Sequence, residues 1–127
     1  MGKDHPYTAA TYNNIALVYD DMGDYDKALE YYGKALEIVE SKLGKDHPYT
    51  ATTYNNIAGV HYAKGDYDKA LEYYGKALRI LLNTIKNHPN TISCFQNLAL
   101  CYQEANMEKD FEEWLQEQFN TPPEPSK

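Results

Sequence analysis

The sequence lacks any uninterrupted apolar run near the roughly 20 residues that a helix needs to cross a bilayer. Its opening residues, Met1 to Pro6, are polar and lack the apolar stretch of a secretory signal. Gly2 is not closely followed by the serine or threonine of a myristoylation motif, since Tyr7 stands in that region. These absences predict a cytoplasmic protein with no membrane partner.

Motifs of catalysis and metal binding are also missing, including Gly-rich phosphate loops, Gly-x-Ser-x-Gly, His-Glu-x-x-His and Cys-x-x-Cys. Cys94 and Cys101 are separated by about 10 Å along one predicted helix, which is too far for a disulfide. Two buried thiols in a reducing compartment are therefore expected. His5, His47 and His88 each precede a proline, and we expect them to cap turns. The sequence predicts no enzyme, no metal and no cofactor.

Positive charge is scarce. The chain has 12 Lys and Arg against 19 Asp and Glu, a net charge of −7, and Arg79 is its sole arginine. Such a balance repels phosphate backbones and anionic lipid, so no nucleic-acid partner is expected. With 127 residues, 43% of them hydrophobic, the chain can bury the core of one ordinary domain.

What the chain does have is a repeat. The segment from Gly2 to Ala9 recurs from Gly44 to Ala51, and the segment from Gly23 to Tyr32 recurs unchanged from Gly65 to Tyr74. A third, degraded copy begins near Asn87. Self-similarity at a fixed period is typical of stacked repeat proteins. The predicted organisation is repeat 1 at 2–43, repeat 2 at 44–85, a degenerate third repeat or C-terminal cap at 86–119, and a Pro-rich tail at 120–127.

Each copy predicts two helices. Proline suits the first helical position, because its missing N–H would have no intrahelical partner there. An apolar stripe at helical spacing follows, from Tyr12 to Tyr19. Gly23 can end this helix in a left-handed conformation and Asp24 can cap the next one. Helices are predicted at 8–22, 24–43, 48–64, 66–84, 89–105 and 108–119, with no strand.

Small alanines are expected where the two helices of a copy cross, at Ala16 and Ala28 in the first copy. Tyrosines are expected to fill the spaces between successive hairpins: Tyr12, Tyr19 and Tyr32. Glutamates crowd the last predicted helix, as a capping element requires: Glu108, Glu112, Glu113 and Glu117. The register of that helix stays open, because its apolar residues do not align cleanly with Ala28, Leu29 and Tyr32: Phe111, Trp114 and Leu115.

The repeat resembles the tetratricopeptide family, in its 42-residue class, like kinesin light chains and highly self-similar 42-residue repeat proteins. The residues that carry the resemblance are Tyr12, Ile15, Ala16, Tyr19, Gly23, Tyr25, Ala28, Tyr32 and Ala35, with their copies Tyr54, Ile57, Ala58, Gly65, Tyr67, Ala70, Tyr74 and Ala77. His61 departs from it, replacing the aromatic residue that matches Tyr19, and is expected to be a polar residue of the groove or of the contact between repeats. The resemblance implies an all-α superhelix, or solenoid, of three helix-turn-helix hairpins with a concave protein-binding groove.

Each first helix carries amide side chains beside its apolar stripe. The resemblance places this helix in the groove, and a primary amide both donates and accepts hydrogen bonds, as a peptide unit does. Alternatively, one amide of each pair bonds the neighbouring repeat. The predicted peptide-binding residues are Asn13, Asn14, Leu17, Asp20, Thr52, Asn55, Asn56, Gly59, Tyr62, Gln96, Asn97 and Leu100, and further candidates by spacing are Ser93 and Gln103.

No lysine or arginine falls at these positions, which argues against the family's clamp for chaperone C-terminal carboxylates. That clamp needs basic residues, whereas Asn13, Leu17, Ser93 and Asn97 occupy the matching places. The predicted function is a protein-interaction scaffold that binds an extended, neutral to basic peptide or partner segment. The alternative is a structural module that stacks end to end into a homo-oligomer.

Overall fold

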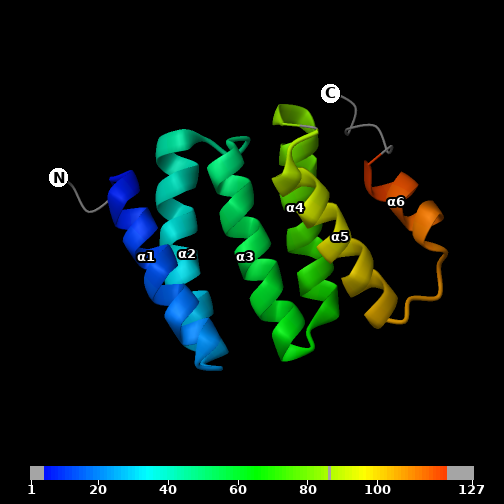
Figure 1. Ribbon diagram of the computed structural model, residues 1–127, viewed down its shortest axis with the longest axis horizontal. Helices are drawn as coiled ribbons and strands as arrows, with labels where there is room; N and C mark the ends of the chain where they lie inside the picture. The colour runs from blue at the N-terminus through cyan, green and yellow to red at the C-terminus, as the bar shows by residue number, and fades with distance from the viewer. Residues whose placement is uncertain (1–4, 86, 120–127) are drawn as a thin grey trace, which may run out of the picture.

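The computed structural model describes residues 5–85 and 87–119 (Figure 1). These residues form six α-helices and contain no strand, which confirms the predicted all-α fold. The predicted tail at 120–127 lies outside the described residues. The helices are α1 (Pro6–Asp21), α2 (Tyr25–Leu43), α3 (Pro48–Lys64), α4 (Tyr67–Thr84), α5 (Pro89–Glu104) and α6 (Phe111–Phe119).

Every first helix starts with the same local device. His5, His47 and His88 stand at the N-caps of α1, α3 and α5, each followed by proline. The Nδ1 atom of each imidazole accepts a hydrogen bond from the backbone N–H two residues later, at 3.0 to 3.1 Å. The three histidines are therefore caps, as predicted.

The first helices also end alike. Gly23 and Gly65 adopt positive φ angles of 83° and 84°, and Asn106 takes the corresponding place after α5 with a φ of 56°. Asparagine is one of the few side chains that tolerate the left-handed region. The third copy thus keeps the turn although it has lost the glycine.

Small residues set the geometry of the first two hairpins. Ala16 and Ala28 are fully buried between α1 and α2, and Ala58 and Ala70 are fully buried between α3 and α4. A methyl side chain on each helix allows the backbones to approach closely, so the predicted crossings are correct.

The expected role of the tyrosines is only partly right. Tyr32 is buried with Ile57 across the boundary between the two hairpins, as predicted. The rings of Tyr12 and Tyr19, however, lie 6.0 and 5.7 Å from the ring of Tyr31, within their own hairpin. Because α1 and α2 run side by side, these rings fill the interior of one hairpin rather than the space between two.

His61, which replaces the aromatic residue at the position of Tyr19, was expected in the groove or between repeats. Instead it is buried, and its ring stacks on Tyr73 of the same hairpin at 5.7 Å and 8°. An imidazole is flat like a phenol ring, so it takes the stacking place of Tyr19 on Tyr31.

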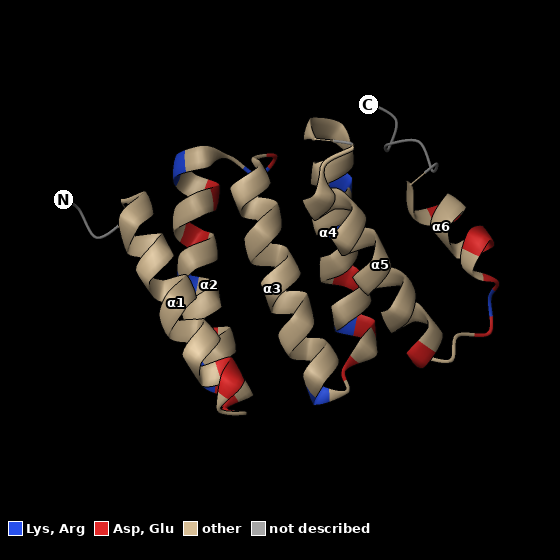
Figure 2. Ribbon diagram, viewed as in Figure 1, with Lys and Arg blue, Asp and Glu red and all other residues tan. Residues whose placement is uncertain are grey.

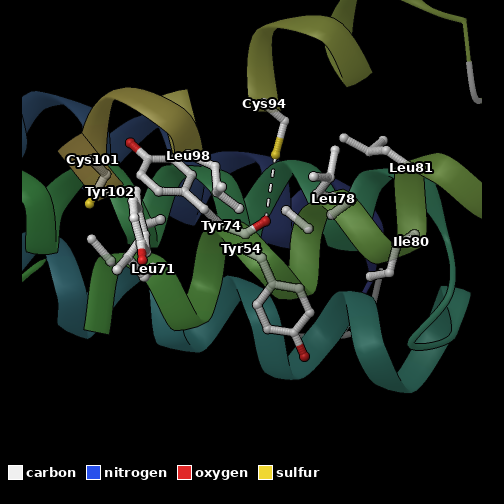
Figure 3. Close-up of a cluster of buried hydrophobic side chains, with 14 residues drawn as sticks. Tyr54, Leu71, Tyr74, Leu78, Ile80, Leu81, Cys94, Leu98, Cys101 and Tyr102 are labelled. Carbon is white, nitrogen blue, oxygen red and sulfur yellow. Dashed lines mark hydrogen bonds between the residues drawn. The ribbon is translucent and has the colours of Figure 1, made fainter. Parts of the chain in front are cut away.

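Successive hairpins meet along one stripe of each first helix, which we call the seam stripe. In α3 it consists of Thr50, Thr53, Ile57 and Val60, and in α5 of Thr91, Cys94, Leu98 and Cys101; all eight are buried. In both helices the leading threonine hydroxyl donates to a carbonyl oxygen of the preceding connection, at 2.7 Å. Figure 3 shows Cys94 pointing at the backbone oxygen of Tyr74.

The last helix departs from the repeat. The backbone N–H of Trp114 bonds the carbonyl of Asp110 at 2.9 Å, as Ala70 bonds Asp66 at 3.0 Å. Trp114 therefore stands where the hairpin crossing has alanine, which settles the open register. An indole prevents a close crossing, and α6 lies apart from α5 while α5 packs on α4 (Figure 1).

Candidate functional site

The predicted site residues all lie on the three first helices, α1, α3 and α5. Their outward side forms one surface, which we call the amide face. Asn14 and Asn97 are exposed on it and Asn56 is half-buried, at equivalent positions of the three helices. The amide face consists of Asn14, Leu17, Thr52, Asn56, Gly59, Ser93, Asn97 and Leu100.

The other member of each amide pair lies nearer the boundary between hairpins. The Nδ2 of Asn13 donates to the hydroxyl of Tyr49 in the next hairpin, at 3.1 Å. Asn55 occupies the same position one repeat later, where the place of Tyr49 is taken by Asn90. The Oδ1 of Asn55 is buried without a hydrogen-bond partner among the described residues. Gln96, the third member, is exposed.

Apolar groups flank a bare position in the middle of the amide face. Leu17 on α1 and Leu100 on α5 are 49% and 48% exposed, and their equivalent on α3 is Gly59. The nearest atom to the position of a Cβ at Gly59 is the hydroxyl oxygen of Tyr74, at 3.8 Å, so the surface above Gly59 is open. A bulky side chain of a partner could reach the α3 backbone there.

One end of the surface is acidic. The phenol of Tyr62 bonds the carboxylate of Glu104, which raises the pKa of Tyr62 to about 12. Partial burial, and then the charge of Asp21, raise the pKa of Asp20. Gln103 is exposed at the corresponding position of α5. Carboxylates at this end would attract a cationic group.

Cations are nearly absent from the first helices. Neither α1 nor α5 contains lysine or arginine, and α3 contains only Lys64 at its last residue. Lys64 pairs with Asp26 on α2 at 3.2 Å. Figure 2 accordingly shows the first helices almost uncoloured, with charge gathered at their ends and on the second helices. The amide face is neutral, with an acidic end.

Sequence reasoning missed a cavity of about 580 Å³ along the outer side of α4. It extends from Lys45 and Tyr54 at one end to Trp114 on α6. Lys76 lies in its wall, 5.5 Å from the ring centre of Tyr54 and 3.7 Å from the carboxylate of Glu72. No sequence motif predicted this cavity, because the register that places Trp114 at an alanine position, where α6 cannot close on α5, is visible only in the structure.

Among residues 5–85 and 87–119, no group of three or more His, Cys, Asp or Glu residues could hold a metal ion. In the same part of the chain, no helix has the length and apolar character needed to span a bilayer.

The close-packed pairs α1–α2 and α3–α4, followed by α5 packed on α4, define a helical-hairpin repeat protein. The family model described as Tetratricopeptide repeat matches residues 7–83, which is more than half of the chain. The chain therefore belongs to the tetratricopeptide repeat family. This family generally mediates protein–protein interaction or assembly and is typically non-enzymatic.

Solved structures share the fold. BtubC (BKLC) from P. vanneervenii has 24% identity and a TM-score of 0.80, over 98% of this chain and 53% of that one. The nearly identical TPR-like repeats of kinesin light chain type from Podosopora anserina have 24% identity and a TM-score of 0.74, over 83% and 50%. A glutamine-to-methionine variant of those repeats has 22% identity and a TM-score of 0.71, over 93% of this chain and 56% of that one. This chain thus spans about half the length of these structures. No curated protein matches it.

Proposed function

We propose that this protein is an interaction scaffold whose amide face holds an extended segment of a partner protein. The observation that carries the proposal is the equivalent, outward position of three asparagines, Asn14, Asn56 and Asn97, on three successive first helices. Each amide can donate to a carbonyl and accept from an N–H of a peptide backbone. Repeated amides therefore bind a chain in extended conformation with little choice among its side chains.

Selectivity would come from the middle and the end of the amide face. Exposed Leu17 and Leu100 on either side of Gly59 favour a bulky apolar side chain of the partner over the glycine. The carboxylates of Asp20 and Glu104 favour a basic residue toward the acidic end, and the net charge of −7 opposes an acidic segment. The partner segment is therefore neutral to basic, with one apolar anchor.

The test is a titration with two synthetic peptides that share one central leucine, one flanked by lysines and the other by glutamates. The lysine peptide should bind more tightly at low salt, and the difference should shrink at high salt, because surface charge is screened. Preference for the glutamate peptide would contradict the charge argument.

Variants of the protein locate the binding surface. Asn56→Ala should weaken the lysine peptide, while Asn83→Ala, at an exposed position on the cavity side of α4, serves as the matched control. Gly59→Leu should block the apolar anchor, with Gly33→Leu, at an exposed glycine of α2, as the matched control. Equal affinity of Asn56→Ala and the unchanged protein for both peptides would overturn the proposal. Circular dichroism would establish that each variant keeps its helices.

End-to-end stacking of whole copies is the second candidate. Large apolar side chains exposed on α1 and at its C-cap favour it, namely Tyr7, Val18 and Met22. The opposite end counts against it, because α6 is short and exposes Glu112 and Glu113. Light scattering over a range of concentrations distinguishes the two functions, since a monomeric binder has constant mass.

A further inference from the structure

The cavity beside α4 is lined by a stripe of residues on one side of that helix. Asp68, Glu72, Gly75 and Arg79 follow one another at a spacing of three or four residues, so they share one side of α4. Trp114 of α6 also lines the cavity. A volume of about 580 Å³ falls within the range of ordinary ligand pockets, so the cavity is large enough to hold part of a partner molecule.

The two ends of this stripe carry opposite charges. Asp68 is exposed in the first turn of α4, and Arg79 is exposed about three turns further on, roughly 16 Å away along the axis at 1.5 Å per residue. Arg79 donates a hydrogen bond to the backbone carbonyl oxygen of Gln118, and its guanidinium group lies 5.4 Å from the ring centre of Phe119. Neither of these two groups carries a negative charge, so neither neutralises the guanidinium.

The remaining charges of the cavity balance one another. The Nζ atom of Lys76 lies 3.7 Å from the carboxylate of Glu72, and Lys45 is followed directly by Asp46. The two ends of the stripe therefore determine the direction of the electric field along the cavity. A ligand with one sign of charge is attracted at one end and repelled at the other, whereas a ligand with two opposite charges is attracted at both.

The basic end of the cavity does not come from the repeat. The sequence of α2 recurs unchanged in α4 as far as Leu78, but the next position is Glu37 in the first copy and Arg79 in the second. Trp114 likewise stands where the two earlier copies have alanine. The cavity therefore combines two departures from the repeated pattern, a reversed charge on α4 and an indole on α6.

We propose that this cavity binds an extended segment of a partner protein that carries one acidic and one basic residue about five positions apart, since an extended chain covers about 3.3 Å per residue. The acidic residue pairs with Arg79 and the basic residue with Asp68. Between them, a large apolar side chain lies over Gly75, where a Cβ would meet no atom within 4 Å, and against the indole of Trp114. The stripe and the indole belong to α4 and α6, so the inference does not depend on the amide face of the first helices.

The fluorescence of Trp114 provides the test, because Trp114 is the single tryptophan of the chain and lines the cavity. Three synthetic peptides share a central phenylalanine and differ only in two flanking residues about five positions apart, which are lysine and glutamate, two lysines or two glutamates. The lysine–glutamate peptide should change the fluorescence and bind the cavity about tenfold more tightly than the other two at low salt, because only this peptide gains a charge pair at each end. The difference should shrink at high salt.

Charge-reversal variants of the full chain should change the preference. Asp68→Lys makes both ends of the stripe basic, so the two-glutamate peptide should become the tightest. Arg79→Glu introduces the residue of the first copy and makes both ends acidic, so the two-lysine peptide should become the tightest. Asp26→Lys is the matched control, because Asp26 is exposed at the equivalent position of α2, and it should leave the order of the three affinities unchanged.

A side chain at Gly75 should block the site without changing its charge. Gly75→Leu occupies the place of the apolar residue of the peptide and should weaken the lysine–glutamate peptide about tenfold or more, because that residue loses its burial. Gly33→Leu, at the equivalent position of α2, should leave the affinity unchanged. Circular dichroism establishes that each variant keeps its helices.

Four results would overturn the proposal. The fluorescence of Trp114 could stay constant while calorimetry detects binding, which would place the peptide outside the cavity. The order of affinities could be the same in Asp68→Lys, Arg79→Glu and the unchanged chain. Light scattering could find a dimer that the lysine–glutamate peptide dissociates, which would identify a second copy as the occupant. Finally, tighter binding of that peptide in Glu124→Gln would identify residues 120–127 of the same chain as the occupant.

Discussion

The pairs α3–α4 and α5–α6 start from the same local signals but pack differently. In the first pair Ala58 and Ala70 are fully buried at a close crossing. In the second, Ala99 is half-buried and Trp114 stands in place of Ala70. The side chain at this one position therefore determines whether the two helices of a repeat can cross closely. An alanine methyl group allows a close crossing, whereas the indole of Trp114 keeps the helices apart.

The two second helices, α4 and α6, therefore differ in how deeply their side chains are buried. All seven buried residues of α4 belong to the hydrophobic core, whereas α6 has no fully buried residue. Partly buried rings replace close backbone contact, with Tyr102 lying 5.1 Å from Phe111 and 4.9 Å from Trp114. Stability should therefore be concentrated in the first four helices and α5.

The largest expected effect comes from equivalent leucines of the two second helices. Leu71→Ala should cost about 2–5 kcal/mol of unfolding free energy, because Leu71 is 5% exposed in the core. Leu115→Ala should cost clearly less, since Leu115 is only partly buried. Urea denaturation measures both, and equal losses would show that α6 shares the α4 core fully.

The next effect tests the crossing itself. Ala58→Leu should overpack the crossing of α3 and α4 and cost about 1–3 kcal/mol. Ala99→Leu at the equivalent position should cost less, because Trp114 already keeps α6 at a distance. Chemical denaturation measures the loss of unfolding free energy in each variant. A larger loss for Ala99→Leu than for Ala58→Leu would contradict the idea that α6 packs less closely on α5 than α4 does on α3.

A smaller, stabilising effect is expected on the outer sides of the intact hairpins. Gly33 and Gly75 lie in the interior of α2 and α4, and a Cβ at either position meets no atom within 4 Å. Replacing each by alanine should stabilise the protein by about 0.4–1 kcal/mol, since the unfolded chain loses freedom. Thermal unfolding would show whether both hairpins gain alike; a loss at Gly75 would point to a close contact on the cavity side.

The smallest effect is confined to acid pH and concerns His61, where the second hairpin differs from its neighbours. Burial lowers the pKa of His61 from its ordinary 6.5, with a smaller opposing influence of Asp66. The unfolded chain therefore binds the proton more readily, and stability should fall as pH drops below 6.5. His61→Tyr should remove that part of the pH dependence. Unchanged pH profiles in the two proteins would mean that the buried imidazole does not titrate.

Much of the fold was predictable because specific residue types mark the ends of the helices. Proline after a capping histidine starts each first helix, and Gly23 or Gly65 ends it with a positive φ angle. The position of α6 was not predictable, because a longer connection of six residues hides the alignment of Asp110 with Asp66. Only the backbone bond of Trp114 reveals that register.

The candidate site was predictable in outline. Helical spacing placed the amides on the first helices, but it could not decide which member of each pair turns outward. That depends on where the next hairpin lies, and Tyr49 shows it by bonding Asn13. Peptide binding by these amides stays a prediction. The cavity beside α4 could not be predicted from the sequence, because residues from distant parts of the chain line it, such as Lys45 and Trp114.

The closest packing joins only helices that are neighbours along the chain, from α1–α2 to α4–α5. A pulling force applied to the two ends would therefore act on each of these interfaces in turn, so that they can separate one at a time. The lightly attached α6 should peel away first, and the remaining hairpins should open stepwise and re-form without long loops to close. Under force, the described part of the chain should therefore extend stepwise, with the lowest mechanical resistance at α6.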